Sequence, residues 1–444
     1  MPLHKGLMKG GFKLPECEKH FHEHDESWLM IQGKAVGFWI DDQGKKELFQ
    51  LEAGDVWMIP AGYEHGLEGQ AGEGFTINVF TGTLPPTCHK PGHYHLEKEN
   101  YIPSLQIVRT PTDRYTAPPA LPATMKGIMF VAKGQAALQD EPTPAFGPGK
   151  ILCKTIYSGL TNGTERNVLV GGNYGGTWPL RCGYQNVGRV LQVAPGVQGF
   201  NVGDLVFSAN FSQHVQYFAA DAPKEVDPNN LVVKLPEQID PKHAALLGVA
   251  GVATHDVRRA DVGLGDKVLV IGAGPIGQFT AQTAKAAGAA VTICDLNPHR
   301  LDIAAQLGIA SRVRVTGEQS WADLKAAGPF DAVFEDSGAM ILDKVVGSGW
   351  GNGLLTMRGK AIIIAGRKEV AYNFNSGQSC ELTLLHAGHF ERGDLLELLR
   401  LVVAGTIKIG PVIQDVVPYA QAASVYDRLR DNPGSLMGTV FVWQ

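Results

Sequence analysis

The sequence predicts two folded parts: an all-β domain at the N-terminus, then a larger part in which a β-rich region leads into a doubly wound parallel sheet. Over residues 1–98, short apolar runs alternate with turn residues, which is typical of a small barrel or sandwich. From Lys242 onward, strand-like and helix-like patterns alternate, and this predicts a right-handed parallel sheet covered by helices. The length of 444 residues accommodates about two to three domains.

The composition narrows the class of protein. The chain is 44% hydrophobic and 19% charged, and its net charge is -5. Because no basic block stands out, we expect neither nucleic acid nor an anionic membrane as a partner. No apolar run is long enough to span a bilayer, and the first residues lack the apolar core of a signal peptide. The six cysteines are scattered without a CxxC pair, which predicts free thiols and a cytoplasmic protein.

The all-β domain is predicted over residues 1–98. Its strand candidates are apolar runs separated by turns, and they cover Ser27–Ile31, Ala35–Ile40, Asp55–Ile59 and Phe75–Phe80. Five prolines lie between residues 99 and 122. A proline-rich stretch between two patterned regions is the composition of a linker, so we assign 99–122 to that role.

The larger part begins with a second strand-rich region over 123–245. The strand candidates of the parallel sheet follow, at Lys267–Ile271, Ala290–Cys294, Arg312–Val315, Ala332–Phe334 and Ala361–Ile364. Helical patterns separate them, at Gln278–Ala287, Pro298–Leu307 and Ser320–Ala326. Two later helices and a final strand are predicted at Gly393–Ala404, Tyr419–Asp431 and Thr439–Trp443.

The most informative motif is a glycine turn at Gly272, Gly274 and Gly277, between the strand candidate Lys267–Ile271 and a helix. Gly272 permits a tight turn, Gly274 lets the backbone approach a pyrophosphate, and Gly277 lets the helix pack closely on the strand. The turn also contains Pro275 and Ile276. The helix N-terminus that follows would face the phosphates. The pattern predicts a bound dinucleotide; the alternative is a glycine turn that binds no nucleotide.

Asp295 ends the second strand, 18 residues past Gly277, and completes the dinucleotide-binding unit. Its carboxylate can accept a hydrogen bond from a ribose 2′-hydroxyl and would repel a 2′-phosphate, so we expect NAD rather than NADP. Arg300 keeps NADP open as an alternative, although the plainer interpretation is that Arg300 is a solvated helix residue. Ser337 and Gly366 follow two further strands, at the carboxyl ends where ligands bind in this architecture, and are predicted to line the cofactor.

The N-terminal domain carries a second motif, in which His20, His22 and Glu26 lead into a strand. Residues two apart on a strand share a face, so these three side chains are expected to project together. A strand and a tight turn would return His65 to the same place. Three imidazoles and one carboxylate suit a divalent zinc, manganese, iron or nickel ion. His24 shares the parity and is an alternative ligand.

These residues resemble the cupin family. Its first motif, His-x-His-x3-Glu-x6-Gly, is matched by His20, His22, Glu26 and Gly33. Its second, Gly-x5-Pro-x-Gly-x2-His-x3-Asn, is matched by Gly54, Pro60, Gly62 and His65, with Gly69 in place of the final Asn. The resemblance covers about residues 15–97 and implies a cupin β-barrel that binds metal through His20, His22, Glu26 and His65. The alternatives are a barrel without metal and a barrel that senses substrate or assembles the protein.

Residues from about 124 to 444 resemble the medium-chain dehydrogenase/reductase superfamily. The matching stretches are Lys154–Glu165, Gly183–Leu191, Gly203–Val206, the dinucleotide unit, the helix at 393–405 and the strand that starts at Gly438. The resemblance implies a GroES-like β domain over 123–245 and a Rossmann domain over 246–390. It further implies that residues 391–444 return to the GroES-like domain. Like the cupin resemblance, it implies a homo-oligomer.

The departures from this superfamily concern zinc. Zinc-dependent members have a Cys in the early turn and a His-Glu pair after a Gly, whereas this chain has Thr161-Asn-Gly-Thr-Glu165 and Tyr184-Gln185. Tyr and Gln are poor zinc ligands. A structural zinc would need closely spaced cysteines, and the sequence has none. The module resembles a zinc-less subset with a Gly-Thr-Glu turn, which includes dehydrogenases of bacteriochlorophyll synthesis and several sugar or polyol enzymes.

Hydride transfer without zinc still needs a proton donor and acceptor beside the reacting oxygen. Tyr184 and Glu165 are candidates, because they occupy the former ligand positions that border the substrate. His255, which we expect to open the helix that crosses into the cofactor domain, is a third. For each of them the alternative is a hydrogen-bonded structural role.

Together these features predict an NAD-dependent oxidoreductase that acts on an alcohol, polyol or sugar without catalytic zinc in the dehydrogenase module. The attached metal-binding cupin would isomerise or sense the same substrate, and the expected partner is a small hydroxylated molecule. The alternative is a metal-dependent cupin isomerase or dioxygenase, joined to a nucleotide-binding module without redox chemistry.

Overall fold

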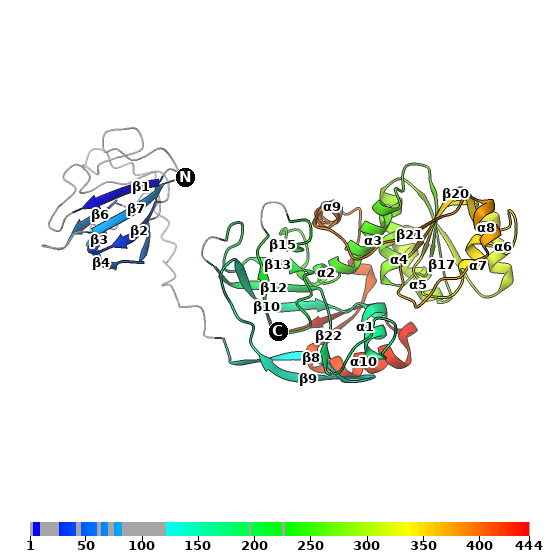
Figure 1. The fold of residues 1–444 in the computed structure, drawn as a ribbon, viewed down its shortest axis with the longest axis horizontal. Helices are drawn as coiled ribbons and strands as arrows, with labels where there is room; N and C mark the ends of the chain where they lie inside the picture. The colour runs from blue at the N-terminus through cyan, green and yellow to red at the C-terminus, as the bar shows by residue number, and fades with distance from the viewer. Residues whose placement is uncertain are drawn as a thin grey trace. The chain divides into compact units, whose positions relative to one another are not determined.

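The structure is a computed structural model that describes residues 3–8, 26–40, 46–59, 64–69, 75–81, 121–194, 197–223 and 227–443. The chain divides into two compact units, Met1–Thr116 and Ala117–Gln444 (Figure 1). The predicted linker, as far as residue 120, lies outside the described residues. Across the described ranges, every helix is too short or too polar to cross a bilayer.

The first unit contains two antiparallel sheets. One has the order β1 (Leu3–Met8), β7 (Phe75–Thr81), β2 (Glu26–Gln32) and β5 (Val56–Ile59). The other has the order β4 (Lys46–Glu52), β3 (Lys34–Ile40) and β6 (Glu64–Gly69). The four predicted strands are present as β2, β3, β5 and β7. Among the described strands the two sheets remain separate, so the expected barrel is not closed there.

Alternating burial builds the core of the first unit. Trp57 and Ile59 of β5 are buried, whereas Val56 and Met58 between them are exposed, because successive strand side chains point to opposite faces. Trp28 of β2 packs against Trp57 edge to face, with ring centroids 5.4 Å apart. Ala35 of β3 and Leu51 of β4, from the other sheet, belong to the same buried cluster, so the two described sheets share one core.

The second unit starts with a β-rich domain. Its larger sheet has the order β15-β13-β12-β10-β23-β22, with β14 also paired to β10, and a smaller sheet has the order β11-β8-β9. The strands are β8 (Thr124–Ala132), β9 (Gln135–Pro142), β10 (Lys150–Gly159), β11 (Leu180–Arg181), β12 (Asn186–Val193), β13 (Leu205–Ser208), β14 (Tyr217–Asp221), β15 (Val232–Lys234), β22 (Ile413–Pro418) and β23 (Gly438–Val442). The C-terminal strand β23 pairs antiparallel with β10, so the end of the chain lies in this domain.

A six-stranded parallel sheet forms the other domain of this unit, in the order β18-β17-β16-β19-β20-β21. Its strands are β16 (Lys267–Ile271), β17 (Ala290–Asp295), β18 (Ser311–Arg314), β19 (Phe330–Glu335), β20 (Leu355–Ile363) and β21 (Thr383–His386). The strand order reverses beside β16, which is the switch point where a doubly wound sheet binds nucleotides.

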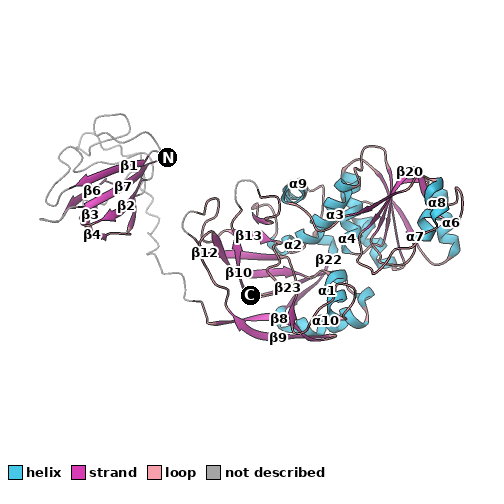
Figure 2. Ribbon diagram, in the orientation of Figure 1, coloured by secondary structure: helices cyan, strands magenta, loops and turns pink. Residues whose placement is uncertain are grey.

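Helices cover both faces of the parallel sheet (Figure 2). Val268 and Val270 of β16 pack toward α4 (Pro275–Ala286) and α5 (Pro298–Gln306). Leu269 and Ile271 pack toward α6 (Glu318–Ala327) and α7 (Leu342–Val346). Both faces of the strand are buried, which explains why its sequence is continuously apolar rather than alternating.

The remaining helices connect the two domains or cover their edges. They are α1 (Asn162–Leu169), α2 (Pro241–Ala244), α3 (Leu247–Arg259), α8 (Phe374–Ser379), α9 (Arg392–Val403) and α10 (Ala422–Asp431). All five predicted strands of the parallel sheet and all the predicted helices are present, with ends shifted by a few residues. The sequence pattern predicted neither the helix α1 nor the strand β21.

Candidate active site

The glycine turn links β16 to α4 as predicted. Gly272 has a φ of +102°, and a Cβ atom on it would lie 2.9 Å from the backbone nitrogen of Ser337. A Cβ atom on Gly277 would lie 1.8 Å from the carbonyl oxygen of Gly272, so the strand and helix touch there. Gly274 is the N-cap of α4, and the space around its Cβ position is open to at least 4 Å. An open cradle of backbone at a helix N-terminus fits a pyrophosphate.

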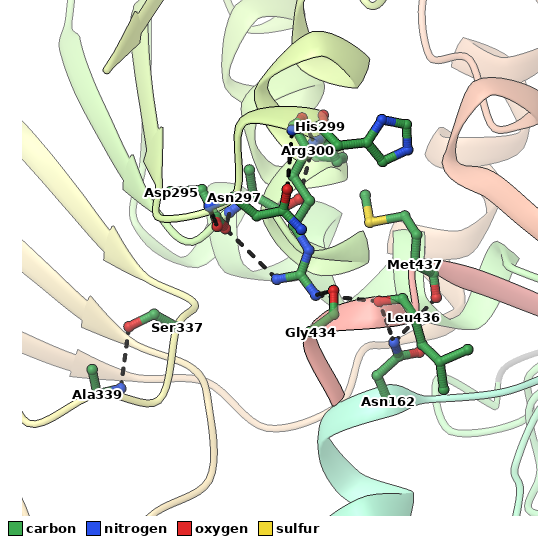
Figure 3. A network of polar contacts seen from close by, with 12 residues as sticks. Asn162, Asp295, Asn297, His299, Arg300, Ser337, Ala339, Gly434, Leu436 and Met437 are labelled. Atoms are coloured by element: carbon green, nitrogen blue, oxygen red, sulfur yellow. Dashed lines mark hydrogen bonds and ion pairs between the residues drawn. The ribbon is translucent and has the colours of Figure 1, made fainter. Parts of the chain in front are cut away.

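Asp295 lies beside this turn, at the end of β17 (Figure 3). One carboxylate oxygen accepts the backbone N–H of Ala273 at 2.7 Å, and the other accepts the N–H of Asn297 at 2.7 Å. These bonds fix the carboxylate next to the glycine turn and leave lone pairs for further donors. The residues present therefore fit a dinucleotide whose ribose carries free hydroxyls.

Arg300 is not the solvated residue that the plainer interpretation expected. Its side chain is 19% exposed, and its Nη1 lies 3.7 Å from Asp295. Its Nη2 donates to the carbonyl oxygens of Gly434 at 3.4 Å and Leu436 at 3.2 Å. The side chain of Asn162 donates to Leu436 from the opposite side, at 3.3 Å (Figure 3). Arg300 thus connects the parallel-sheet domain to a segment of the β-rich domain.

Ser337 and Gly366 lie at the carboxyl ends of β19 and β20, where they were expected. The Ser337 hydroxyl donates to Glu335, which is also paired with Arg367. Gly366 is in close contact with Tyr174 of the β-rich domain, because a Cβ atom on Gly366 would lie 2.1 Å from the Tyr174 hydroxyl. The two domains meet at this edge of the sheet. That both residues line a cofactor stays a prediction.

The positions that would hold zinc carry a neutral hydrogen-bond network. Gln185 donates to the Gly159 carbonyl at 3.2 Å and to the Thr161 hydroxyl at 3.4 Å, and it accepts the N–H of Val249 at 3.2 Å. The Tyr184 hydroxyl shares a hydrogen bond with Thr161. Zinc needs thiolate, imidazole or carboxylate ligands, and these three side chains supply none. Burial raises the pKa of Tyr184, so the phenol keeps its proton.

Glu165 lies in a buried cluster with Cys182 and His214, whose ligand-type atoms are all within 4.8 Å of one another. Its carboxylate accepts the N–H of Thr161 at 2.8 Å and the hydroxyl of Tyr426 at 2.5 Å. The Cys182 thiol donates to it at 3.7 Å, and Nε2 of His214 lies 3.2 Å away. Burial, followed by the charge of Glu165, raises the pKa of Cys182 well above its ordinary value.

The donor types of this cluster are ones that zinc accepts, but hydrogen bonds already complete it. Nδ1 of His214 lies 2.7 Å from the Ser158 hydroxyl, which accepts from Nε1 of Trp443 at 2.8 Å. Every polar group is satisfied when Ser158 donates to Nδ1 and Nε2 donates to Glu165. A metal would have to displace these protons and ionise a buried thiol. The arrangement is therefore that of a hydrogen-bonded core, and Glu165 faces it rather than an open cleft.

His255 lies in the interior of α3 and does not open that helix, contrary to expectation. Its Nδ1 lies 2.8 Å from Asp394 of α9, and Arg258 donates to the same carboxylate at 2.5 Å. Asp394 also accepts the backbone N–H of Glu391, within the capping box that starts α9. His255 therefore helps to anchor α9 on α3. Its catalytic role stays a prediction.

His389 was missed by the sequence analysis. It follows β21 and has a φ of +57°. Its ring lies 5.2 Å from that of Tyr184 and 5.2 Å from that of Phe211, measured between centroids. Within the described part of the chain, its Nε2 is buried without a hydrogen-bond partner. The signal that would have found it is its place after a strand of the parallel sheet, but β21 was not predicted.

In the first unit, the structure describes part of the predicted metal site. His65 of β6 is buried between Trp28 and Trp57, at centroid distances of 5.6 and 6.2 Å. Glu26 begins β2, and its backbone pairs with Ile59 and Thr81. The side chain of Glu26 and all of His20, His22 and His24 lie outside the described residues. The metal site stays a prediction.

Comparison with curated proteins identifies relatives of the second unit. The chain is 29% identical to 2-dehydro-3-deoxy-L-galactonate 5-dehydrogenase of Pseudoalteromonas atlantica, over 59% of this chain and 82% of that protein. It is 26% identical to a probable D-xylulose reductase A of Arthroderma otae, over 70% and 96%. It is 29% identical to 2-desacetyl-2-hydroxyethyl bacteriochlorophyllide A dehydrogenase of Rhodobacter capsulatus, over 70% and 95%.

Solved structures share the fold of this unit. The 2R,3R-butanediol dehydrogenase of Bacillus subtilis superposes with a TM-score of 0.62 at 21% identity, and the match covers 72% of this chain and 99% of that one. A thermostable alcohol dehydrogenase of Pyrobaculum aerophilum gives 0.61 at 23% identity, over 72% and 99%.

Two protein families match consecutive parts of the chain. Residues 147–258 match the alcohol dehydrogenase GroES-like domain, and residues 275–402 match the zinc-binding dehydrogenase family. The first range covers β10 to β15 with α1, α2 and most of α3, and the second covers β17 to β21 with α4 and most of α9. With the fold and the dinucleotide turn, these matches assign the second unit to the medium-chain dehydrogenase/reductase superfamily.

Proposed function

We propose that this protein is an NAD-dependent dehydrogenase that interconverts a secondary hydroxyl and a ketone on a polyol, sugar or sugar acid. The observation that carries the proposal is the glycine turn between β16 and α4 with Asp295 fixed beside it. Relatives named for a deoxy-galactonate, xylulose and sorbitol support the substrate class. Asn162 and Tyr174 add polar groups from the β-rich domain. Asn162 contacts Leu436, which Arg300 also contacts, and Tyr174 lies beside Gly366 at the end of β20.

We further propose that the dehydrogenase works without zinc at the former ligand positions, because Thr161, Tyr184 and Gln185 satisfy one another there. NAD, when bound, accepts the hydride from the alcohol carbon. Tyr184 keeps its proton and would donate a hydrogen bond to the substrate oxygen. Glu165 and His255 are positioning residues in this proposal. Glu165, in its buried cluster, holds the backbone of Thr161, and His255 holds Asp394 of α9.

The test has two arms. Quenching of protein fluorescence by NADH and by NADPH measures cofactor binding, and NADH is expected to bind at least about tenfold more tightly. A panel of polyols, sugars and sugar acids is then screened for NAD⁺ reduction, with and without Zn²⁺, Mn²⁺ or Fe²⁺. Turnover that does not depend on zinc is expected. Failure of NADH to bind would reject the proposal, and strict zinc dependence would reject its zinc-less part.

For the first unit, we propose a cupin domain with a divalent metal at His20, His22, Glu26 and His65. The buried position of His65 between two tryptophans supports it, because a neutral imidazole is a common metal ligand. Metal content of the purified full chain is expected to be about one equivalent and to fall in His65→Gln. The exposed His299→Gln is the matched control. Equal metal content in both variants would contradict the proposal.

A further inference from the structure

Side chains from both domains of the second unit meet near the carboxyl ends of β20 and β21. His389 and Gly366 come from the carboxyl ends of β21 and β20, and ligands bind at such ends in a doubly wound sheet. Tyr184 and Phe211 come from the β-rich domain and meet His389 at ring distances of 5.2 Å each. His389 therefore lies close to both the carboxyl end of β21 and Tyr184, one of the positions that hold zinc in zinc-dependent members.

One ring nitrogen of His389, Nε2, is buried without a hydrogen-bond partner among the described residues. When the neutral ring carries its proton on Nδ1, Nε2 is a hydrogen-bond acceptor. A buried acceptor without a partner is rare in folded proteins and points to a function.

The surroundings hold the ring in place and yet allow access to it. His389 has a left-handed backbone, and the next residue, Phe390, is buried against Gly251 of α3. The ring of Phe211 lies across the imidazole at an interplanar angle of 31°, although Phe211 is itself 63% exposed and left-handed, with a φ of 55°. Displacing this exposed ring would open Nε2 to a substrate without breaking the core.

We propose that His389 is the catalytic proton acceptor of the dehydrogenase, through Nε2. This rests on the proposed function. In the oxidation, the substrate O–H bond breaks and its proton passes to Nε2, while the C–H bond breaks and its hydride passes to NAD⁺. A C=O bond forms, and the products are the ketone, NADH and imidazolium. Reduction runs the same steps backward, with the imidazolium as the proton donor. Tyr184 donates a hydrogen bond to the same oxygen.

The charges around His389 agree with this role. Burial, and secondarily the neighbouring His255 of α3, lower the pKa of His389 from its ordinary value. The imidazole is therefore neutral at neutral pH and able to accept a proton. Asp394, behind His255, is paired with His255 and Arg258, and Tyr184 stays protonated.

The test uses the full-length protein and the best substrate from the polyol panel. His389→Asn keeps a residue that tolerates the left-handed backbone, and His389→Gly removes the ring without strain. Both are expected to lower kcat for oxidation by about 100- to 10,000-fold. NADH affinity should stay within about twofold of wild type. Added imidazole is expected to restore turnover to His389→Gly, and the fall of kcat toward acid pH should disappear. His243→Asn, on α2, is the control and should behave as wild type.

Each outcome is decisive. Turnover within about threefold of wild type in His389→Asn would overturn the role of His389 while leaving the proposed function intact. So would loss of turnover that imidazole does not rescue and that comes with loss of NADH binding, because it would show a structural role. A wild-type protein that binds NADH but oxidises none of the panel would overturn the proposed function and this inference together.

Discussion

At the scale of single residues, backbone hydrogen bonds fix Asp295, the carboxylate on which we expect the choice between NAD and NADP to depend. Its two oxygens accept the backbone N–H groups of Ala273 and Asn297, so the carboxylate has a fixed orientation beside the glycine turn. Replacement by Ser is expected to weaken NADH binding by about 1.5–3 kcal/mol, or roughly 10- to 100-fold, because a charge-assisted hydrogen bond is lost.

The same replacement is expected to improve NADPH binding, since the charge that repels a 2′-phosphate is gone. Fluorescence titration with both nucleotides measures the change. Asp302→Ser, at an exposed position of α5, is the matched control. Unchanged affinity for both nucleotides in Asp295→Ser would show that the adenosine binds elsewhere.

A second residue-scale prediction concerns Asp256 of α3, which is 1% exposed. One of its oxygens has no hydrogen-bond partner among the described residues. Burial, followed by the charge of Asp394, raises its pKa to about 8. In the unfolded chain an Asp has a pKa of about 3.9. The folded state therefore binds a proton that the unfolded state releases between these two values.

Because the folded pKa is the higher one, this contribution to stability is complete below about pH 3.9 and is lost as the pH rises toward 8. The slope is at most about 1.4 kcal/mol per pH unit. Asp256→Asn cannot titrate and should remove that part of the pH dependence. Urea unfolding at pH 5.5, 6.5 and 7.5 compares the two proteins. Parallel curves for wild type and variant would contradict the raised pKa.

At the scale of elements, the contact between β16 and α4 depends on Gly277. A methyl group there would clash with the Gly272 carbonyl, and that carbonyl belongs to the backbone, so it cannot turn away as a side chain could. Gly277→Ala is expected to push α4 off the strand, to destabilise the domain by about 2–5 kcal/mol and to abolish NADH binding.

Gly274→Ala is the matched variant, because open space surrounds its Cβ position and its φ of -67° suits alanine. It should fold normally but weaken NADH binding, since the methyl occupies the space above the helix N-terminus. Thermal unfolding and NADH titration of both variants distinguish the two effects. Tight NADH binding by Gly274→Ala would place the pyrophosphate away from this turn.

The elements that sequence reasoning predicted are those with a strong local signal. The apolar runs of β16 and β17 and the glycine turn between them are such elements, because buried parallel strands are continuously apolar. By contrast, α1 begins with Asn162-Gly163, a turn signal, and becomes helical where Glu165 and Leu169 are buried. The strand β21 is four residues long at the edge of its sheet. Missing β21 is the reason that His389 was missed.

At the scale of the whole molecule, the two domains of the second unit are tied together through residues 434–437. Arg300 holds this segment from the cofactor domain, and Asn162 holds it from α1 (Figure 3). Arg300→Ala is expected to lower stability by about 1–3 kcal/mol, because the part-buried contact with the Leu436 carbonyl loses its charged donor.

Hydrogen exchange of residues 434–437 should also become faster in Arg300→Ala. Arg400→Ala removes an exposed ion pair with Glu397 and is the control, with an expected loss below about 1 kcal/mol. Mass spectrometry of exchanged peptides measures the local effect. Equal exchange in both variants would show that Arg300 does not tie the domains together.

The sequence by itself predicted a nicotinamide cofactor, and it determined the strands and helices of the parallel sheet. The glycine turn, the acid after the next strand and the alternation of strands and helices are local patterns, and local patterns are readable without a fold. Only the tertiary structure decided what Glu165, His255 and Arg300 do, since their partners Tyr426, Asp394 and Leu436 come from distant parts of the chain. It also brought His389 to Tyr184. Contacts between distant segments depend on how the whole chain packs, which no local pattern specifies.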